Sequence, residues 1–352
     1  MFTMKILHSA DWHLDSPIQG RSAQQTRLLR QALLQIPGRI AALCRQEKCD
    51  MVLLAGDLFD GGYSRESCRI VRDELEEMAV PVFIAPGNHD YAAGDSPWLM
   101  ESWPENVHVF TKPVVERVEV PALGCCVYGA GFTAMDCPGL LENFRAKGDC
   151  AIGVFHGDPT QTSSPYCPVT QAQVKESGLA YLALGHIHKG GSFCAGNTLC
   201  AWPGCPMGRG YDEQGEKGVL IATLAEQVST RFVPLEGIHF YDLEVNPEQL
   251  DSVLPPVGSE DFYRITLTGE SEPLELPVLQ QRYARFPNLE LRDQTVRPVD
   301  PWAAAGEDSF EGMYFKMLQQ AMEGQDEQTC HRILLAAKIS RRILDGQEVV
   351  LP

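Results

Sequence analysis

The chain has 352 residues, 44% of them hydrophobic, and a formal net charge of −18. This length suggests two domains with a helical tail, and the composition is ordinary for a globular protein with a sizeable core. No apolar stretch approaches the roughly 20 residues that a bilayer-spanning helix needs. The N-terminus has neither the basic lead nor the long apolar segment of a signal peptide. We therefore expect a cytoplasmic protein with no membrane segment.

The acidic charge argues against tight unaided binding of nucleic acid, because that affinity comes from neutralising phosphates. Bound divalent cations would nevertheless make a site locally positive. The twelve cysteines form no Cys-x-x-Cys pair. They favour reduced, buried thiols over a disulfide framework or a zinc site.

Up to about residue 235 the pattern alternates strands with helices. Helical periodicity covers 24–48, where Pro37-Gly38 should kink or break the helix, and 66–78. Residues 106–128 are strand-like, and 192–234 predict antiparallel strands with glycine-rich turns. Beyond a seam near 236–247, the pattern predicts a strand, a helix and a strand, then a linker and two helices. Their ranges are 262–267, 274–284, 289–291, 298–308, 309–323 and 327–345.

Five short apolar runs end in residue types that bind metals. Such runs, bounded by glycine or polar residues, are typical of buried strands. If the strands lie side by side in one core, their ends share one rim, where sheet proteins place their chemistry. The residues that follow the runs are Asp11 and His13; Asp57; Asn88, His89 and Asp90; His156; and His186 and His188. Each segment alone is more often structural, but together they indicate a two-metal hydrolase.

Two divalent metals about 3.5–4 Å apart can clamp the attacking and leaving oxygens of a phosphoryl transfer. Asp57 is the natural bridging carboxylate. The mixed His, Asp and Asn donors favour manganese, with iron or zinc as alternatives, over magnesium or calcium. His89 follows Asn88 directly, so we expect it to act beside the metals, where it can donate a proton to the leaving oxygen or stabilise charge on the phosphate, with Asp90 helping to orient it. His8, His108, His239 and His331 lack such company and are interpreted as structural or surface residues.

The ordered motifs resemble those of the calcineurin-like metallophosphoesterases over the first two-thirds of the chain. The resemblance implies an α/β (α+β) fold, a β-sandwich flanked by helices with the dimetal site at one end. By resemblance, one metal would be held by Asp11, His13, Asp57 and His188, the other by Asp57, Asn88, His156 and His186. His89 would act on the scissile phosphate. The motifs are Asp11-x-His13, Gly56-Asp57, Gly87-Asn88-His89-Asp90, His156 and Gly185-His186-x-His188.

Residues 6–14, 56–60, 202–209 and 215–218 further resemble the DNA-repair exonuclease branch, the SbcD and YhaO proteins. That branch usually has Ser or Asn where Cys205 stands. The resemblance implies a catalytic domain at 1–240, a small α+β capping domain at 241–300, and a helical tail at 301–352. The tail would dock a partner or pack on its own domain. Arg209, on the presumed rim, is a candidate phosphate contact, with a surface role as the alternative.

We therefore expect a dimetal phosphodiesterase, a DNA exonuclease or endonuclease subunit of a DNA-repair complex. It would use a metal-activated hydroxide, with His89 assisting departure of the leaving alcohol. The expected partners are DNA and an SbcC-like coiled-coil ATPase, and a homodimer is left open. The alternatives are a hydrolase of small phosphodiesters or nucleotides, and a non-catalytic scaffold with a vestigial site.

Overall fold

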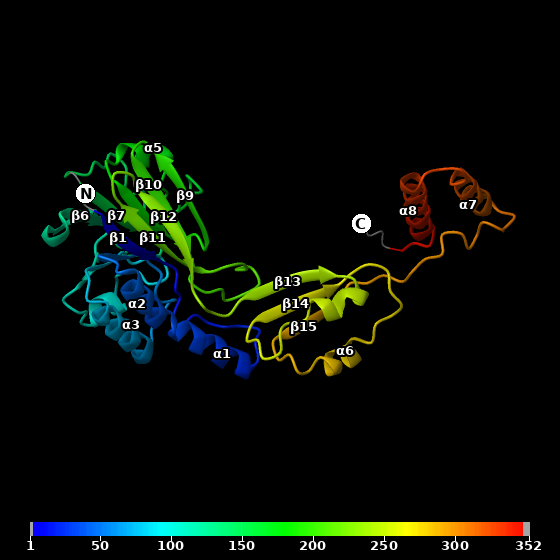
Figure 1. Cartoon of the computed structure of the whole chain (residues 1–352), viewed down its shortest axis with the longest axis horizontal. Coiled ribbons are helices and arrows are strands. Elements are labelled where there is room, and N and C mark those ends of the chain that lie inside the picture. The colour runs from blue at the N-terminus through cyan, green and yellow to red at the C-terminus, as the bar shows by residue number, and fades with distance from the viewer. Residues whose placement is uncertain (1–2, 149, 348–352) are drawn as a thin grey trace. The chain divides into compact units, whose positions relative to one another are not determined.

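The structure, a computed structural model, describes residues 3–148 and 150–347. The chain divides into two compact units. Unit 1 comprises residues 1–241 and 260–262, and unit 2 comprises 242–259 and 263–352 (Figure 1). Unit 2 thus contains both the small α+β fold and the C-terminal helices, which the sequence analysis assigned to separate domains. The division into 1–240, 241–300 and 301–352 stays a prediction.

The first sheet of unit 1 has the strand order β12-β11-β1-β2-β3-β4. The pairs β1-β2, β2-β3 and β3-β4 are parallel, whereas β11 is antiparallel to both β1 and β12. The strands span Met4–Ser9 (β1), Met51–Leu54 (β2), Val82–Ile84 (β3), Val107–Val109 (β4), Gly218–Leu224 (β11) and Ser229–Pro234 (β12).

The second sheet has the order β5-β6-β7-β8-β10-β9. Its middle strands β6, β7, β8 and β10 are parallel, and the edge strands β5 and β9 are antiparallel to their neighbours. The strands span Glu116–Val120 (β5), Cys125–Gly129 (β6), Ala151–His156 (β7), Tyr181–Gly185 (β8), Lys189–Ala195 (β9) and Thr198–Gly204 (β10). The predicted antiparallel run over 192–234 therefore contributes to two different sheets.

The two sheets pack face to face through alternate side chains of their strands. Ile6 and Leu53 of the first sheet share one buried cluster with Ile152 and Ala183 of the second. Leu7 and Val52 point the other way and pack against helices, as the two-residue period of a strand requires. The outer face of the second sheet has a cluster of its own. The expected β-sandwich flanked by helices is confirmed.

The helices of unit 1 cover these outer faces, with α2 and α3 beside the first sheet (Figure 1). The predicted helix over 24–48 is two helices that meet at Gln35, because Pro37 fits only the first turn of the second one. The helices span Ala23–Leu34 (α1), Ile36–Glu47 (α2), Arg65–Glu77 (α3), Pro97–Met100 (α4) and Gln171–Glu176 (α5), with a 3₁₀ helix at Pro121–Leu123.

Unit 2 is built on a small sheet of order β13-β14-β15, in which β14 and β15 are parallel and joined through α6. This is the expected strand–helix–strand arrangement. Helices α7 and α8 follow, and Arg342 of α8 binds Glu270. Among the described residues, no helix is both long and apolar enough to cross a membrane. The elements span Phe240–Val245 (β13), Phe262–Leu267 (β14), Leu276–Arg282 (α6), Leu289–Asp293 (β15), Phe310–Ala321 (α7) and Glu327–Leu344 (α8), with a 3₁₀ helix at Pro247–Ser252.

Candidate metal centre

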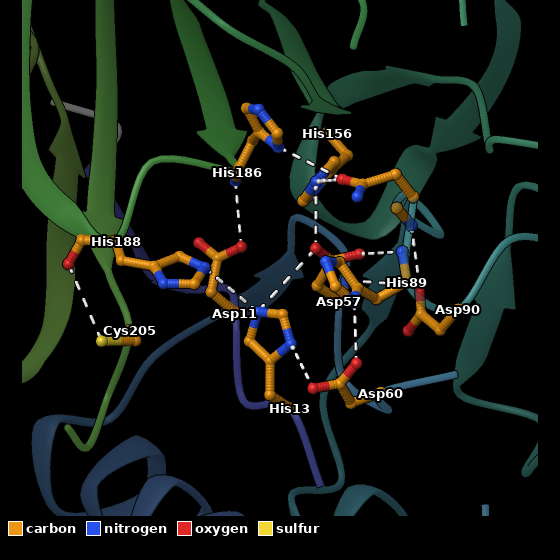
Figure 2. Close-up of polar contacts among 12 residues, drawn as sticks. Asp11, His13, Asp57, Asp60, His89, Asp90, His156, His186, His188 and Cys205 are labelled. Carbon is orange, nitrogen blue, oxygen red and sulfur yellow. Dashed lines mark hydrogen bonds and ion pairs between the residues drawn. The ribbon is translucent and has the colours of Figure 1, made fainter. Parts of the chain in front are cut away.

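The candidate ligands gather where parallel strands of both sheets end. Asp11 follows β1, Asp57 follows β2 and Asn88 follows β3, all in the first sheet. His156 is the last residue of β7, and His186 follows β8 in the second sheet. Figure 2 shows the side chains of Asp11, Asp57 and His156 turned toward one another. The sandwich thus brings strand ends of two separate sheets to one rim.

One group of ligand atoms comes from Asp11, His13 and His188, which lie within 4.8 Å of one another. Nε2 of His13 is 3.1 Å from Nε2 of His188. Nδ1 of His188 is 2.7 Å from a carboxylate oxygen of Glu213, which only accepts, so Nδ1 carries the hydrogen. In the neutral ring Nε2 then presents a lone pair. Oδ2 of Asp11 is buried and has no hydrogen-bond partner among the described residues. These converging electron pairs fit a bound cation.

A second group comes from Asp11, Asp57 and His156. Nδ1 of His156 donates to the carbonyl oxygen of Ala55 at 2.8 Å. Its Nε2 faces two acceptors, Oδ1 of Asn88 at 2.9 Å and Oδ2 of Asp57 at 3.3 Å. Burial lowers the pKa of His156, but Asp57 raises it further, to about 9. The surroundings therefore favour positive charge at this point, which again fits a cation.

Asp57 belongs to the second group and also faces His13 of the first. Its Oδ2 is 3.8 Å from Nε2 of His13 and 3.3 Å from Nε2 of His156. Its Oδ1 accepts a hydrogen bond from the backbone N–H of His89 at 2.8 Å. Burial raises the pKa of Asp57, but His156 and His13 together hold it below the ordinary value. The side chain is thus a carboxylate that faces a histidine of each group. That it bridges two ions stays a prediction.

The backbone at the rim is strained. Asp11, His13, Asp57 and His186 have φ angles of 56°, 49°, 54° and 85°, in the left-handed region that side chains disfavour. Strain of this kind costs about 1–3 kcal/mol per residue and concentrates at functional sites. Gly87 allows the tight approach of these loops, because a Cβ there would lie 2.2 Å from Oδ1 of Asp57.

His186 lies beside the second group and contacts Asn88 and Asp11. Its Nδ1 lies 3.2 Å from Oδ1 of Asn88, and its backbone N–H donates to Oδ1 of Asp11 at 3.0 Å. Burial and the neighbouring His156 lower the pKa of His186 to about 4. The ring therefore stays neutral at physiological pH, the form in which histidine binds metals.

Asp60, rather than Asp90, binds the ring of His89. Oδ1 of Asp60 is 2.7 Å from Nδ1 of His89, and this contact raises the pKa of His89, against the effect of burial. Asp90 is buried and accepts hydrogen bonds from the backbone amides of Gly87 and Leu58, each at 2.8 Å. The expectation that Asp90 orients His89 is therefore wrong, because those amides occupy the Asp90 carboxylate, which holds the loops together.

Arg209 joins two carboxylates at the rim. Nη2 donates to Oε1 of Glu213 at 2.8 Å, and Nη1 donates to Oδ2 of Asp60 at 3.3 Å. Arg209 thus links the carboxylate behind His188 to the one that binds His89. Its contact with a phosphate stays a prediction.

Glu213 and Asp60 are site residues that the sequence did not predict. Asp60 stands in the Gly-Asp-Leu-Phe-Asp motif, and that position was the available signal. Nothing in the sequence marks Glu213.

Cys205, which departs from the branch pattern, packs below His188. Its thiol donates to the carbonyl oxygen of His188 at 3.7 Å (Figure 2). Burial raises the pKa of Cys205 to about 12. The thiol therefore stays protonated, which fits a packing role better than metal binding.

The chain is similar to a family model and to several known proteins. The family model described as calcineurin-like phosphoesterase matches residues 4–190. Metallophosphoesterase YhaO of Bacillus subtilis (strain 168) is 33% identical over 234 residues, which cover 61% of this chain and 56% of YhaO. The SbcD component of nuclease SbcCD from Staphylococcus epidermidis is 28% identical over 331 residues, 81% of this chain and 84% of that protein.

Among solved structures, a dimetal phosphatase from Danio rerio is 15% identical with a TM-score of 0.44, over 68% of this chain and 98% of its own. The family match covers more than half of the chain and every candidate metal ligand, from Asp11 to His188. The chain therefore belongs to the calcineurin-like phosphoesterase family.

Proposed function

We propose that this protein is a dimetal phosphodiesterase that cleaves DNA. The observation that carries the proposal is the position of Asp57, whose Oδ2 faces His13 on one side and His156 on the other. One ion would be held by Asp11, His13, Asp57 and His188, the other by Asp57, Asn88, His156 and His186. Two such ions supply charge stabilisation for the phosphate and an activated water nucleophile.

The residues around the ions have their own tasks. His89 is partly open to solvent, with 40% of its side chain exposed, and Asp60 favours its protonated form. A protonated imidazole beside the scissile phosphate can donate its proton to the leaving oxygen. Glu213 orients His188 and Asp60 orients His89, while Arg209 holds both carboxylates in place.

DNA is the proposed substrate because a relative that aligns over most of both chains is named as part of the nuclease SbcCD. By the same relation we propose a coiled-coil ATPase of the SbcC kind as partner, docked on α7 and α8. Manganese as the resident metal, a cytoplasmic location and a homodimer stay predictions. The mixed nitrogen and oxygen donors support manganese, with iron or zinc as alternatives.

A competing function is the hydrolysis of small phosphodiesters or nucleotides. The net charge of −18 favours it, since a strongly acidic surface repels a polyanion. A small substrate carries little charge and is less affected.

The test measures cleavage of linear duplex DNA, single-stranded DNA and bis(p-nitrophenyl) phosphate by the purified chain with added manganese. The proposal expects cleavage of all three, lost in Asp57→Ala and retained in the matched control Asp73→Ala. Asp73 is an exposed carboxylate on α3 whose contacts are with Arg69 and Arg72. Cleavage of the small diester alone, unchanged after the ATPase partner is added, would identify a small-molecule hydrolase.

A further inference from the structure

A groove of about 550 Å³ opens beside the metal centre and shares His188 with it. It is lined by residues of β9 and β10 from the second sheet and of β11 and β12 from the first. Strand β10 contacts both β11 and β12, so the two sheets meet at this groove. The groove therefore leads away from the candidate ligands along the junction of the two sheets.

Lys217 lines this groove and is 8% exposed. Its Nζ lies 3.5 Å from the carbonyl oxygen of His188. Over residues 3–148 and 150–347, no carboxylate forms an ion pair with it. A buried ammonium without an anion is costly, since its hydration is lost and only a neutral carbonyl replaces it. A phosphate in the groove would supply the missing charge.

Two aromatic side chains lie in the same groove. Trp202 of β10 donates its Nε1–H to the carbonyl oxygen of Lys189 at 2.9 Å, which fixes the orientation of the indole. The ring lies across β9, where a Cβ on Gly191 would stand 2.5 Å from its Cζ2. Phe232 of β12 is 39% exposed. Trp202 itself is half-buried and packs against the outer cluster of the second sheet. Accessible aromatic faces next to lysines are the surface on which single-stranded nucleic acids stack their bases and place their phosphates.

The charge of this groove differs from that of the molecule. Lys189 and Lys217 line it against one carboxylate, Glu216, although the whole chain carries −18. A second groove, of about 450 Å³, lies beside His89. Among the described residues it is lined by Asp90 and Asp95 and by no lysine or arginine. Of these two approaches to the centre, the first is the one that suits a phosphate chain.

We propose that the groove beside His188 holds the nucleotide next to the scissile phosphate of a DNA strand. Lys217 and Lys189 bind its phosphate, and Trp202 and Phe232 stack on its base. This inference rests on the proposed function and names the part of the substrate that the metal centre does not reach. It also gives a strongly acidic chain a local means of holding a polyanion.

The experiment follows hydrolysis of octathymidylate and of bis(p-nitrophenyl) phosphate in manganese, with the full chain. Trp202→Ala should raise KM for octathymidylate about tenfold, since one stacked base is lost. Tyr91→Ala is the matched control, because Tyr91 is 38% exposed and lines the groove beside His89. Trp202→Phe keeps an aromatic face and should recover most of the affinity.

The contribution of the lysines is tested through the salt dependence of KM for octathymidylate. Lys217→Gln should reduce the slope of log KM against log salt by about 0.7, the value for one phosphate contact on a single strand. Exposed Lys189→Gln should do the same and serves if the buried substitution impairs folding. Lys175→Gln, an exposed change on α5, should leave the slope unaltered.

The outcomes separate the two proposals. If the wild-type protein cleaves octathymidylate and Trp202→Ala, Lys189→Gln and Lys217→Gln all cleave it equally well, the proposed role of the groove is wrong. The proposed nuclease function would still stand. The same holds if Tyr91→Ala, and not Trp202→Ala, raises KM. A wild-type chain that hydrolyses the small diester and neither binds nor cleaves octathymidylate would overturn the proposed nuclease function, and the groove with it.

Discussion

Replacement of Glu213 by glutamine should weaken metal binding without unfolding the protein. The carboxylate is 8% exposed and receives hydrogen bonds from Nδ1 of His188 at 2.7 Å and from Nη2 of Arg209 at 2.8 Å. Glutamine keeps the shape of the side chain and one acceptor oxygen. What it removes is the negative charge behind His188.

The expected loss follows from that contact. A hydrogen bond to a carboxylate is roughly twice as strong as a neutral one, and it makes the imidazole a better electron donor to its metal. Loss of such a partner typically costs about 10–100-fold in metal affinity, or about 1.4–2.7 kcal/mol. Arg209 adds to the loss, because its positive charge stays beside His188 with one carboxylate fewer. Asp60 still binds Arg209, so the loop should keep its conformation.

The assay titrates metal-free enzyme with manganese and follows hydrolysis of bis(p-nitrophenyl) phosphate. Metal content after dialysis, measured by mass spectrometry, gives a readout independent of turnover. Asp212→Asn, an exposed carboxylate next to Glu213, is the matched control. An unchanged manganese midpoint in a folded Glu213→Gln protein would refute the reasoning, and so would an equal shift in Asp212→Asn.

Three further predictions concern single buried or rim residues. Asp60→Asn should lower the pKa of His89, because the hydrogen bond from His89 to the Asp60 carboxylate is the main reason that this pKa is raised. If His89 is the proton donor, the alkaline limb of kcat then moves to lower pH, and a limb that stays in place would assign the proton to another group. Burial lowers the pKa of His8 to about 3, so below pH 6.5 the unfolded chain takes up the proton first. The stability that wild type holds over His8→Gln should be full above pH 6.5 and fall by about 1.4 kcal/mol per pH unit below it. The measurement is the free energy of unfolding of both proteins at pH 7.5 and pH 5.5. A difference between the two proteins that is the same at both pH values would contradict this prediction. Manganese should raise the melting temperature of wild type by mass action; an equal rise in Asp57→Asn would exclude Asp57 as a ligand.

Much of the site could be predicted from the sequence because its signals are local. Each ligand-bearing strand is a short apolar run that ends in a polar residue, as at Asp11, Asp57 and His156. The break near Pro37 is also local, since proline lacks the N–H that a helix interior needs. Family membership followed from five such motifs in order, and the match over 4–190 confirmed it.

Only the tertiary structure decided how these segments are combined. The strands before Asp11 and Asp57 lie in one sheet, and those that end at His156 and His186 lie in the other. Strand β10 pairs with β8, and β11 pairs with β1. These pairings depend on segments that lie far apart in the chain.

The partners of the site residues are non-local in the same way. Asp60 lies 29 residues from His89, and Glu213 lies 25 from His188. Asp90, although adjacent to His89, instead binds the backbone amide of Gly87 in its own loop and that of Leu58 in another. From the sequence alone came the fold family and the candidate ligands, because strand patterning and residue type are written in neighbouring residues. The contacts of Asp57 with His13 and His156, the carboxylates that bind His89 and His188, and the groove beside the centre came from the packing of two sheets, which no short stretch of sequence encodes.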